Sequence, residues 1–143
     1  MCSVPSDLSD RLHHGGLKIS SMSIQDVFTI GPEFQVNTFT SGVQSVPSIA
    51  ALDGGGYVVA WHSFGQDGFG GGIFGQRYGA DGLALGPEFQ INNYTNDDQV
   101  APSVAALDDG GFVVIWQSVL QDGFAQGIYG QRYGSDGLVH CPS

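Results

Sequence analysis

In the short segment Tyr57–Ser63 (YVVAWHS), apolar side chains occupy both alternating sets of positions. In an extended strand, Val59 and Trp61 would point to one side, and Val58 and Ala60 to the other. The β-branched and aromatic residues of this segment also favour a strand. Because a strand that is apolar on both faces lies inside a stack of sheets, the pattern predicts a strand covered on both sides.

Three further strand patterns surround that segment. Ser48–Leu52 is made of small residues that suit a crowded inner position, and Ile73–Tyr78 continues the β-type composition. Glu88–Asn92 alternates polar with apolar residues, as expected of a half-exposed outer strand. Tight turns at Asp53–Gly56 and Gly79–Gly82 separate these segments. Since no segment shows a period of 3.6 residues, we expect four antiparallel strands and almost no helix.

The whole pattern occurs twice at a spacing of 55 residues. When Gly31–Leu83 is compared with Gly86–Leu138 without a gap, 34 of 53 positions are identical. A repeat of this length predicts an architecture of stacked or radially arranged units. We therefore divide the chain into a leader (1–27), a two-repeat domain (28–139, with repeats 31–85 and 86–138) and a tail (140–143).

The gradient across each repeat is typical of a β-propeller blade, in which four-stranded antiparallel sheets pack face to face around an axis. A segment equivalent to the outer strand, Phe28–Asn37, precedes the first complete set of strands, so the content is two blades offset by one strand. Because propellers have about four to eight blades, two blades close only by oligomerisation of three or four chains, or within a longer array. A small β-sandwich is the competing fold.

Three motifs carry a family resemblance: DGG-(Y/F)-VV-x-W-x-S, QDG-F-x-x-G-I-(F/Y)-GQRY-x-x-DG and GPEFQ(V/I)N. Over Ile30–Leu138 the chain resembles tandem repeats of large bacterial secreted and surface proteins, which often carry calcium-binding RTX repeats and leave the cell by type I secretion. The resemblance implies a propeller-like array with an adhesion or binding role at the cell surface or outside the cell. The RTX nonapeptide GGxGxDxUx is absent from this sequence.

Composition and charge narrow the functional classes. Charged residues make up 13% of the chain, hydrophobic residues 41%, and the net charge is −10. A nucleic-acid partner is excluded on these grounds, because phosphate binding needs clustered Lys and Arg. No apolar run approaches the roughly 18 residues of a membrane span.

The two ends of the chain give few signals. Residues 1–27 lack a basic region followed by an apolar core, so we expect no Sec signal peptide and a loosely ordered leader. Cys2 and Cys141 stand near opposite termini, and free thiols are favoured over a disulfide between them.

The candidate binding residues lie in the Gly-rich long loop Phe64–Gly72 and in its counterpart Val119–Gly127. In an antiparallel blade this loop shares one end of the sheet with the connecting loops Thr38–Val46 and Asn93–Ala101. Carboxylate and amide oxygens beside an aromatic ring suit sugar hydroxyls, and the same oxygens suit Ca²⁺. We select Gln66, Asp67, Phe69, Gln121, Asp122 and Phe124 as ligand-binding candidates. The calcium candidates are Asp67, Asp97, Asp98 and Asp122. The alternative is that each loop is stabilised by its own hydrogen bonds.

Structural roles are expected for other conspicuous residues. Trp61 and Trp116 lie between valines and should belong to the core. Arg77 on its strand could reach Glu88 on the neighbouring outer strand, with Arg132 and Glu33 as the equivalent residues.

The sequence favours a non-enzymatic extracellular binding module for carbohydrate or adhesion, without a certain cofactor and with homo-oligomer or neighbouring-repeat partners. The main alternative is a calcium-stabilised structural repeat of a bacterial surface or secreted protein. A glycoside hydrolase is a remote alternative, because no nucleophile elbow, HExxH motif or phosphate loop is present and no carboxylate pair stands out.

Overall fold

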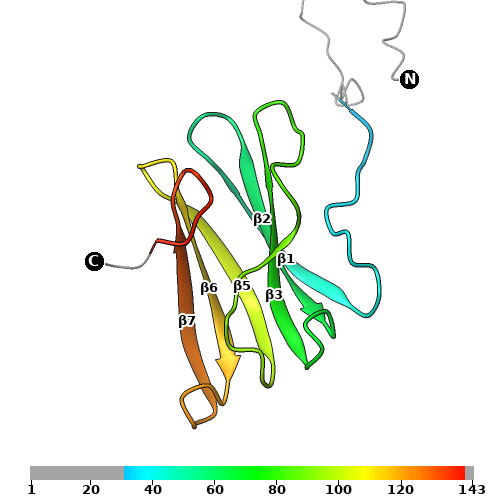
Figure 1. The fold of residues 1–143 in the computed structure, drawn as a ribbon, viewed down its shortest axis with the longest axis vertical. Helices are drawn as coiled ribbons and strands as arrows, with labels where there is room; N and C mark the ends of the chain where they lie inside the picture. Colours follow the sequence, from blue (N-terminus) through cyan, green and yellow to red (C-terminus); the bar gives the residue numbers. More distant parts are fainter. Residues whose placement is uncertain (1–30, 141–143) are drawn as a thin grey trace, which may run out of the picture. The chain divides into compact units, whose positions relative to one another are not determined.

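A computed structural model describes residues 31–140, and this part of the chain contains strands but no helix (Figure 1). All strands belong to the unit that begins at Val36, and the following description concerns that unit. The strands are β1 (Gln44–Ala51), β2 (Tyr57–Phe64), β3 (Gly71–Tyr78), β4 (Phe89–Gln90), β5 (Gln99–Ala106), β6 (Phe112–Val119) and β7 (Gln126–Tyr133).

The strands form two antiparallel sheets in simple sequential order. Sheet A has the order β1-β2-β3-β4, and sheet B has the order β5-β6-β7. The all-β prediction and the antiparallel order are confirmed, and within the described residues the sheets close into neither a barrel nor a propeller.

The outer strands are shorter than the sequence indicated. Only Phe89–Gln90 of the predicted Glu88–Asn92 strand pairs as a strand. Of the predicted strand Phe28–Asn37, residues 31–37 contain no assigned strand, and the first three residues lie outside the described part.

The inner strands are longer than predicted because each contains a β-bulge. The register of β1 on β2 shifts between Ser45 and Ser48, and β5 on β6 shifts between Val100 and Ser103. Val46 and Ala101, each just before a proline, adopt φ angles of +52° and +54° inside these bulges. A bulge inserts an extra residue and interrupts the two-residue period, so the alternation pattern did not extend through it.

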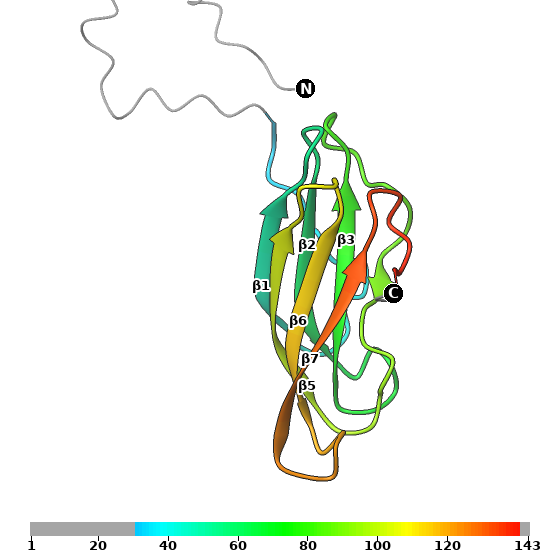
Figure 2. The ribbon, with the colours of Figure 1, turned by 90° about the vertical axis from the view of Figure 1, so that its left-hand side faces the viewer.

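The two sheets stack face to face, with β5, β6 and β7 in front of β1, β2 and β3 in the same order (Figure 2). Each sheet has two unlike faces, which we call front and back. The front faces carry Val59 and Trp61 in sheet A, and Val114 and Trp116 in sheet B. The back faces carry Val58, Ala60 and Ile73 in sheet A, and Val113, Ile115 and Ile128 in sheet B.

The main core lies where the back of sheet A meets the front of sheet B. Its members are Val58, Ala60, Ile73, Ile91, Phe112, Val114, Trp116 and Tyr133. Burial in this core raises the pKa of Tyr133 to about 12. A second cluster covers the front of sheet A and contains Trp61, so both tryptophans are core residues as predicted.

The repeat does not produce equal burial in the two sheets. Val58 and Ala60 of β2 are fully buried, as expected of a strand covered on both faces. In β6 the prediction of double burial is wrong, because Ile115 is 46% exposed. No sheet of the described chain covers the back of sheet B. The inner strand β1 is also an edge strand here, and its Ile49 is 65% exposed rather than packed in a crowded centre.

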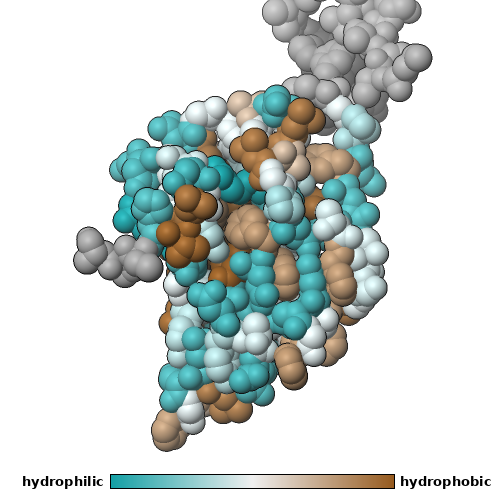
Figure 3. All heavy atoms as spheres, in the orientation of Figure 1, coloured by the Kyte–Doolittle hydropathy of each residue, from teal (hydrophilic) through white to brown (hydrophobic). Residues whose placement is uncertain are grey.

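The connections segregate by length. The tight turns lie at one end of the two sheets, and the long loops and the connecting loop after β4 lie at the other (Figure 1). Figure 3 shows a hydrophobic area at the turn end of the sheets. The turns after β3 and β7 contain exposed hydrophobic residues, including Leu83 and Leu138.

Several sequence predictions concern residues outside the described part: the leader 1–27, Cys2, Cys141 and most of the tail. Within residues 31–140, no helix has the length and apolar content needed to span a bilayer.

Candidate functional site

Each long loop is folded by its own aspartate. Asp67 Oδ1 accepts a hydrogen bond from the backbone N–H of Phe69 at 3.1 Å, and Asp122 Oδ1 accepts one from Phe124 at 3.1 Å. This is the turn that Asp side chains commonly form with a backbone group two residues on. The self-bonding alternative is therefore correct for one oxygen of each aspartate, and the same turn occurs in both repeats.

The aromatic residue of each folded loop stays in solvent. The exposed fraction is 62% for Phe69 and 84% for Phe124. A largely exposed apolar side chain gains little from the hydrophobic effect, because most of its apolar area stays in water. The two rings are thus free to contact another molecule at the loop end of the sheets.

The segment around β4 holds the first long loop from the side. Gln90 Nε2 donates to Asp67 Oδ2 at 3.2 Å, and Gln66 Nε2 donates to Glu88 Oε1. Both oxygens of Asp67 are therefore engaged by protein donors. The two polar residues that we selected in the first repeat, Gln66 and Asp67, therefore hydrogen-bond to Glu88 and Gln90 of the segment around β4.

The second long loop lacks this lateral support in the described residues. Sheet B has no fourth strand there, and nothing donates to Asp122 Oδ2. The side-chain oxygens of Gln66 and Gln121 are both buried without a hydrogen-bond partner in the described part. The two candidate loops consequently share a backbone turn but differ in how open their carboxylates are.

A contact between two loops confirms that they share one end of the sheets. Asp98 Oδ1 accepts from the backbone N–H of Gly71 at 2.8 Å, which joins the connecting loop to the first long loop. Asp97 adopts a left-handed φ of +59° beside this contact. Within residues 31–140 no group of three or more His, Cys, Asp or Glu side chains could hold a metal ion. The four calcium candidates are thus not gathered into one such group, and calcium binding stays a prediction.

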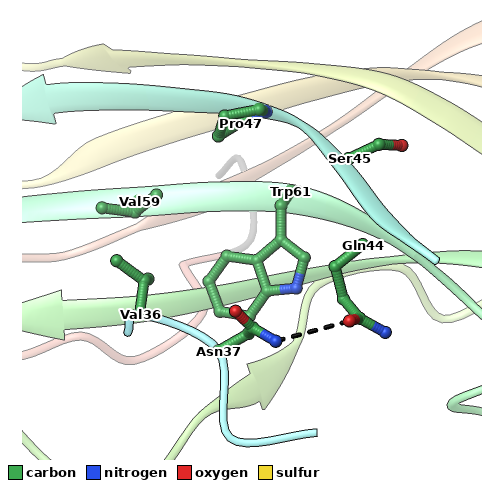
Figure 4. A pocket seen from close by; sticks show the side chains of 7 residues that line it. All are labelled: Val36, Asn37, Gln44, Ser45, Pro47, Val59 and Trp61. Atoms are coloured by element: carbon green, nitrogen blue, oxygen red, sulfur yellow. Dashed lines mark hydrogen bonds between the residues drawn. The ribbon is translucent and has the colours of Figure 1, made fainter. Parts of the chain in front are cut away.

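A pocket of about 170 Å³ lies on the front of sheet A and was missed from the sequence (Figure 4). Asn37 Nδ2 donates to Gln44 Oε1 at 3.4 Å, beside the ring of Trp61. The indole N–H of Trp61 is buried without a partner in the described part, and that of Trp116 is in the same condition. The pocket is lined by Val36, Asn37, Gln44, Ser45, Pro47, Val59 and Trp61. The pocket forms where residues 36–37, 44–47 and 59–61 meet. The alternation of polar and apolar residues within one segment does not predict which segments meet, so it could not reveal the pocket.

Neither Arg77 nor Arg132 forms the cross-strand pair with a glutamate that the sequence predicted. Arg77 donates to the backbone oxygen of Ser135 at 2.8 Å and lies over the ring of Phe112 at 6.0 Å, instead of pairing with Glu88. Arg77 therefore connects the two sheets. Arg132 instead pairs with Asp109 at 2.5 Å. A hydrogen bond from the backbone N–H of Gly111 lowers the pKa of the Asp109 carboxyl, and the nearby Arg132 lowers it further.

Searches against protein-family models, curated proteins and solved structures gave no match to this chain.

Proposed function

We propose that the protein is a non-enzymatic extracellular binding module whose two long loops bind carbohydrate. The observation that carries this proposal is the pair of exposed rings, Phe69 and Phe124, each on a loop already folded by a neighbouring aspartate. A loop ordered before binding loses less conformational entropy when it meets a ligand. An exposed ring can stack on the apolar face of a sugar, while a carboxylate oxygen of Asp67 or Asp122, which has more than one lone pair, accepts a further hydrogen bond from a sugar hydroxyl.

We further propose that the two sheets are blades of a β-propeller-type assembly. Support comes from their sequential strand order and from their stacking with equivalent strands aligned. With two blades in each chain, three or four chains would supply six or eight blades, within the usual range for propellers. This assembly would place all long loops at one end, so that binding is multivalent.

A glycan array tests the carbohydrate proposal with a matched pair of double variants. Phe69→Ala/Phe124→Ala removes both exposed rings, and we expect sugar binding to weaken about tenfold or more. Leu83→Ala/Leu138→Ala is the control, because it removes two side chains with exposed fractions of 67% and 66% at the opposite end of the sheets. Equal binding by the wild type and the phenylalanine variant would contradict the proposal.

The alternative function, a calcium-stabilised structural repeat, would use the same end of the molecule. The observation in its favour is that two oxygen atoms lie close to the same point beside Gly70. A methyl group added at Gly70 would meet Asp98 Oδ1 at 2.7 Å and the Asp97 carbonyl oxygen at 3.0 Å. Thermal unfolding with Ca²⁺ or with a chelator separates the two functions. A calcium-dependent rise in Tm without glycan binding would replace the carbohydrate proposal by this one.

A further inference from the structure

Residues 31–140 form one sheet-to-sheet interface and leave the two complementary faces of a second interface uncovered. The back of sheet A packs on the front of sheet B, where Ala60 and Ile73 are fully buried. Their equivalents on the back of sheet B are Ile115 and Ile128, with exposed fractions of 46% and 69%. The face that is buried in the first repeat is therefore exposed to solvent in the second. Exposed apolar side chains that gather on one face of a sheet are typical of an interaction site.

The outer edge of sheet B is open in the same way. In sheet A, Asn92 Oδ1 accepts from the backbone N–H of Ile73 at 2.7 Å, beyond the short strand β4. The equivalent N–H, that of Ile128 on β7, has no acceptor among residues 31–140. A segment with the required sequence does exist in the chain, since Gly31–Asn37 (GPEFQVN) repeats Gly86–Asn92 (GPEFQIN).

Asn37 already makes part of the hydrogen bonds that Asn92 makes at the edge of sheet A. Its Nδ2 donates to the backbone oxygen of Phe39 and to Gln44 Oε1, just as Asn92 Nδ2 donates to Tyr94 and to Gln99. Asn92 uses its carbonyl oxygen to hold the preceding sheet, whereas Asn37 Oδ1 accepts no hydrogen bond within the described residues. Val36 packs on the front of sheet A, on the opposite side from sheet B, so Asn37 cannot serve β7 of its own chain.

We propose that a second copy of this chain covers the back of sheet B with the front of its own sheet A, and lays residues 31–37 along β7. The proposal rests on the assembly from blades proposed above and is independent of the ligand of the long loops. It makes the contact between copies a repetition of the contact between sheets A and B. Such a head-to-tail contact uses two different surfaces, and it forms a ring when its rotation closes.

The proposed interface between copies would be apolar, like the interface between sheets A and B. All eight positions of the main core remain apolar or aromatic when each residue is replaced by its equivalent. The equivalents are Val113, Ile115 and Ile128 of one copy with Val36, Tyr57, Val59, Trp61 and Tyr78 of the next. Ile115 is larger than Ala60, and Val36 is smaller than Ile91, so one volume change partly offsets the other.

Polar contacts are also reproduced. Ser48 Oγ accepts from the backbone N–H of Val104 across the A–B interface at 3.1 Å. Between copies, Ser103 would accept from the backbone N–H of Ile49, whose side chain is 65% exposed in the single chain. The amide of Gln35 from the second copy would donate to Asp122 Oδ2, as Gln90 donates to Asp67. The second long loop would thus gain the lateral support that it lacks, and its binding site would be completed by the neighbouring copy.

The first test measures the mass of the full chain by light scattering and sedimentation across the micromolar range. We expect an oligomer of three or four copies, and Ile128→Asp should shift it to monomers, with association weakened about tenfold or more. Because Ile128 is exposed in the single chain, circular dichroism should show an unchanged β signal. Phe124→Ala is the control: its equivalent Phe69 stays exposed beside the A–B interface, so the oligomer should persist.

A charge exchange tests the register of the donated segment. Gln35→Glu places a carboxylate against Asp122 of the next copy and should weaken the oligomer. Adding Asp122→Asn to the same chain keeps the side-chain oxygen that folds the loop, supplies an amide to the carboxylate introduced on the donated segment, and should restore the oligomer. A wild type that is monomeric throughout, or an oligomer unaffected by Ile128→Asp, would overturn the proposal. Loss of glycan binding by the Phe124 variant with its mass intact concerns the ligand alone.

Discussion

At the scale of single residues, identical positions in the two repeats carry different contacts. The Asp67 and Asp122 turns are equal because each depends on atoms two residues apart, and such local bonds could be predicted from the sequence. Gln90 reaches Asp67 from 23 positions away. Arg77 reaches Ser135 across the sheet interface, 58 positions away. These contacts depend on sheet stacking, which single-residue chemistry does not contain.

Arg77 and Arg132 provide a residue-scale prediction. Arg77→Ala should lower the free energy of unfolding by about 1–2 kcal/mol, because it removes a charge-assisted hydrogen bond and a cation–π contact between the sheets. Arg132→Ala should cost less than Arg77→Ala, since both members of its ion pair have half-exposed side chains and solvent screens their attraction. Urea unfolding at concentrations where the chain is monomeric measures both. Equal losses would contradict the assigned role of Arg77.

At the scale of strands, the sequence predicted the elements with continuous β-branched or aromatic character most accurately. β2 begins at the predicted residue and ends one residue later. β1 begins four residues before its predicted start, because the bulge at Val46 allows pairing to continue past an irregular position. Residues 31–37 resemble an outer strand in sequence but have no strand assignment. A strand needs a pairing edge, and a sequence pattern records only the residues' suitability for one.

The tight turns give an element-scale prediction. A methyl group added at Gly111 would overlap the carbonyl oxygen of Tyr133 on the neighbouring strand, and Gly56 stands in the same relation to Tyr78. Gly111→Ala should therefore cost about 2–4 kcal/mol, since backbone atoms cannot move aside without disturbing β7.

The control for this prediction is Gly82→Ala. Gly82 has a φ of +78° and open space around its missing side chain, so only the backbone conformation opposes the change, at a cost of about 1–2 kcal/mol. Urea unfolding of both variants gives the comparison. A Gly111 variant no less stable than the Gly82 variant would show that the turn relaxes more easily than its contacts imply.

At the scale of the whole molecule, the sequence indicated two similar units but not which of their surfaces would be covered. Similar repeats predict similar sheets, and both sheets form with matching registers. Ile73 is buried because the front of sheet B covers the back of sheet A, whereas no sheet among residues 31–140 covers Ile128. This difference depends on which sheet faces which, and it cannot be predicted from either repeat alone.

Net charge gives the whole-molecule prediction. Each copy carries a formal charge of −10, so the proposed assembly must overcome repulsion between copies. Raising the salt concentration from about 20 mM to about 300 mM shortens the range of that repulsion and should strengthen association several-fold. Sedimentation at the two salt concentrations measures the change. Weaker association at high salt would indicate an interface held by ion pairs rather than by apolar faces.

The front-to-back stacking also bears on how such a gene can change in length. In the proposed assembly, each 55-residue unit presents one surface to the unit before it and the complementary surface to the unit after it. Duplication or loss of a complete unit would therefore leave the contact between neighbouring sheets unaltered. Unequal recombination could change the number of sheets per polypeptide in single steps, without requiring a compensating substitution at the contact.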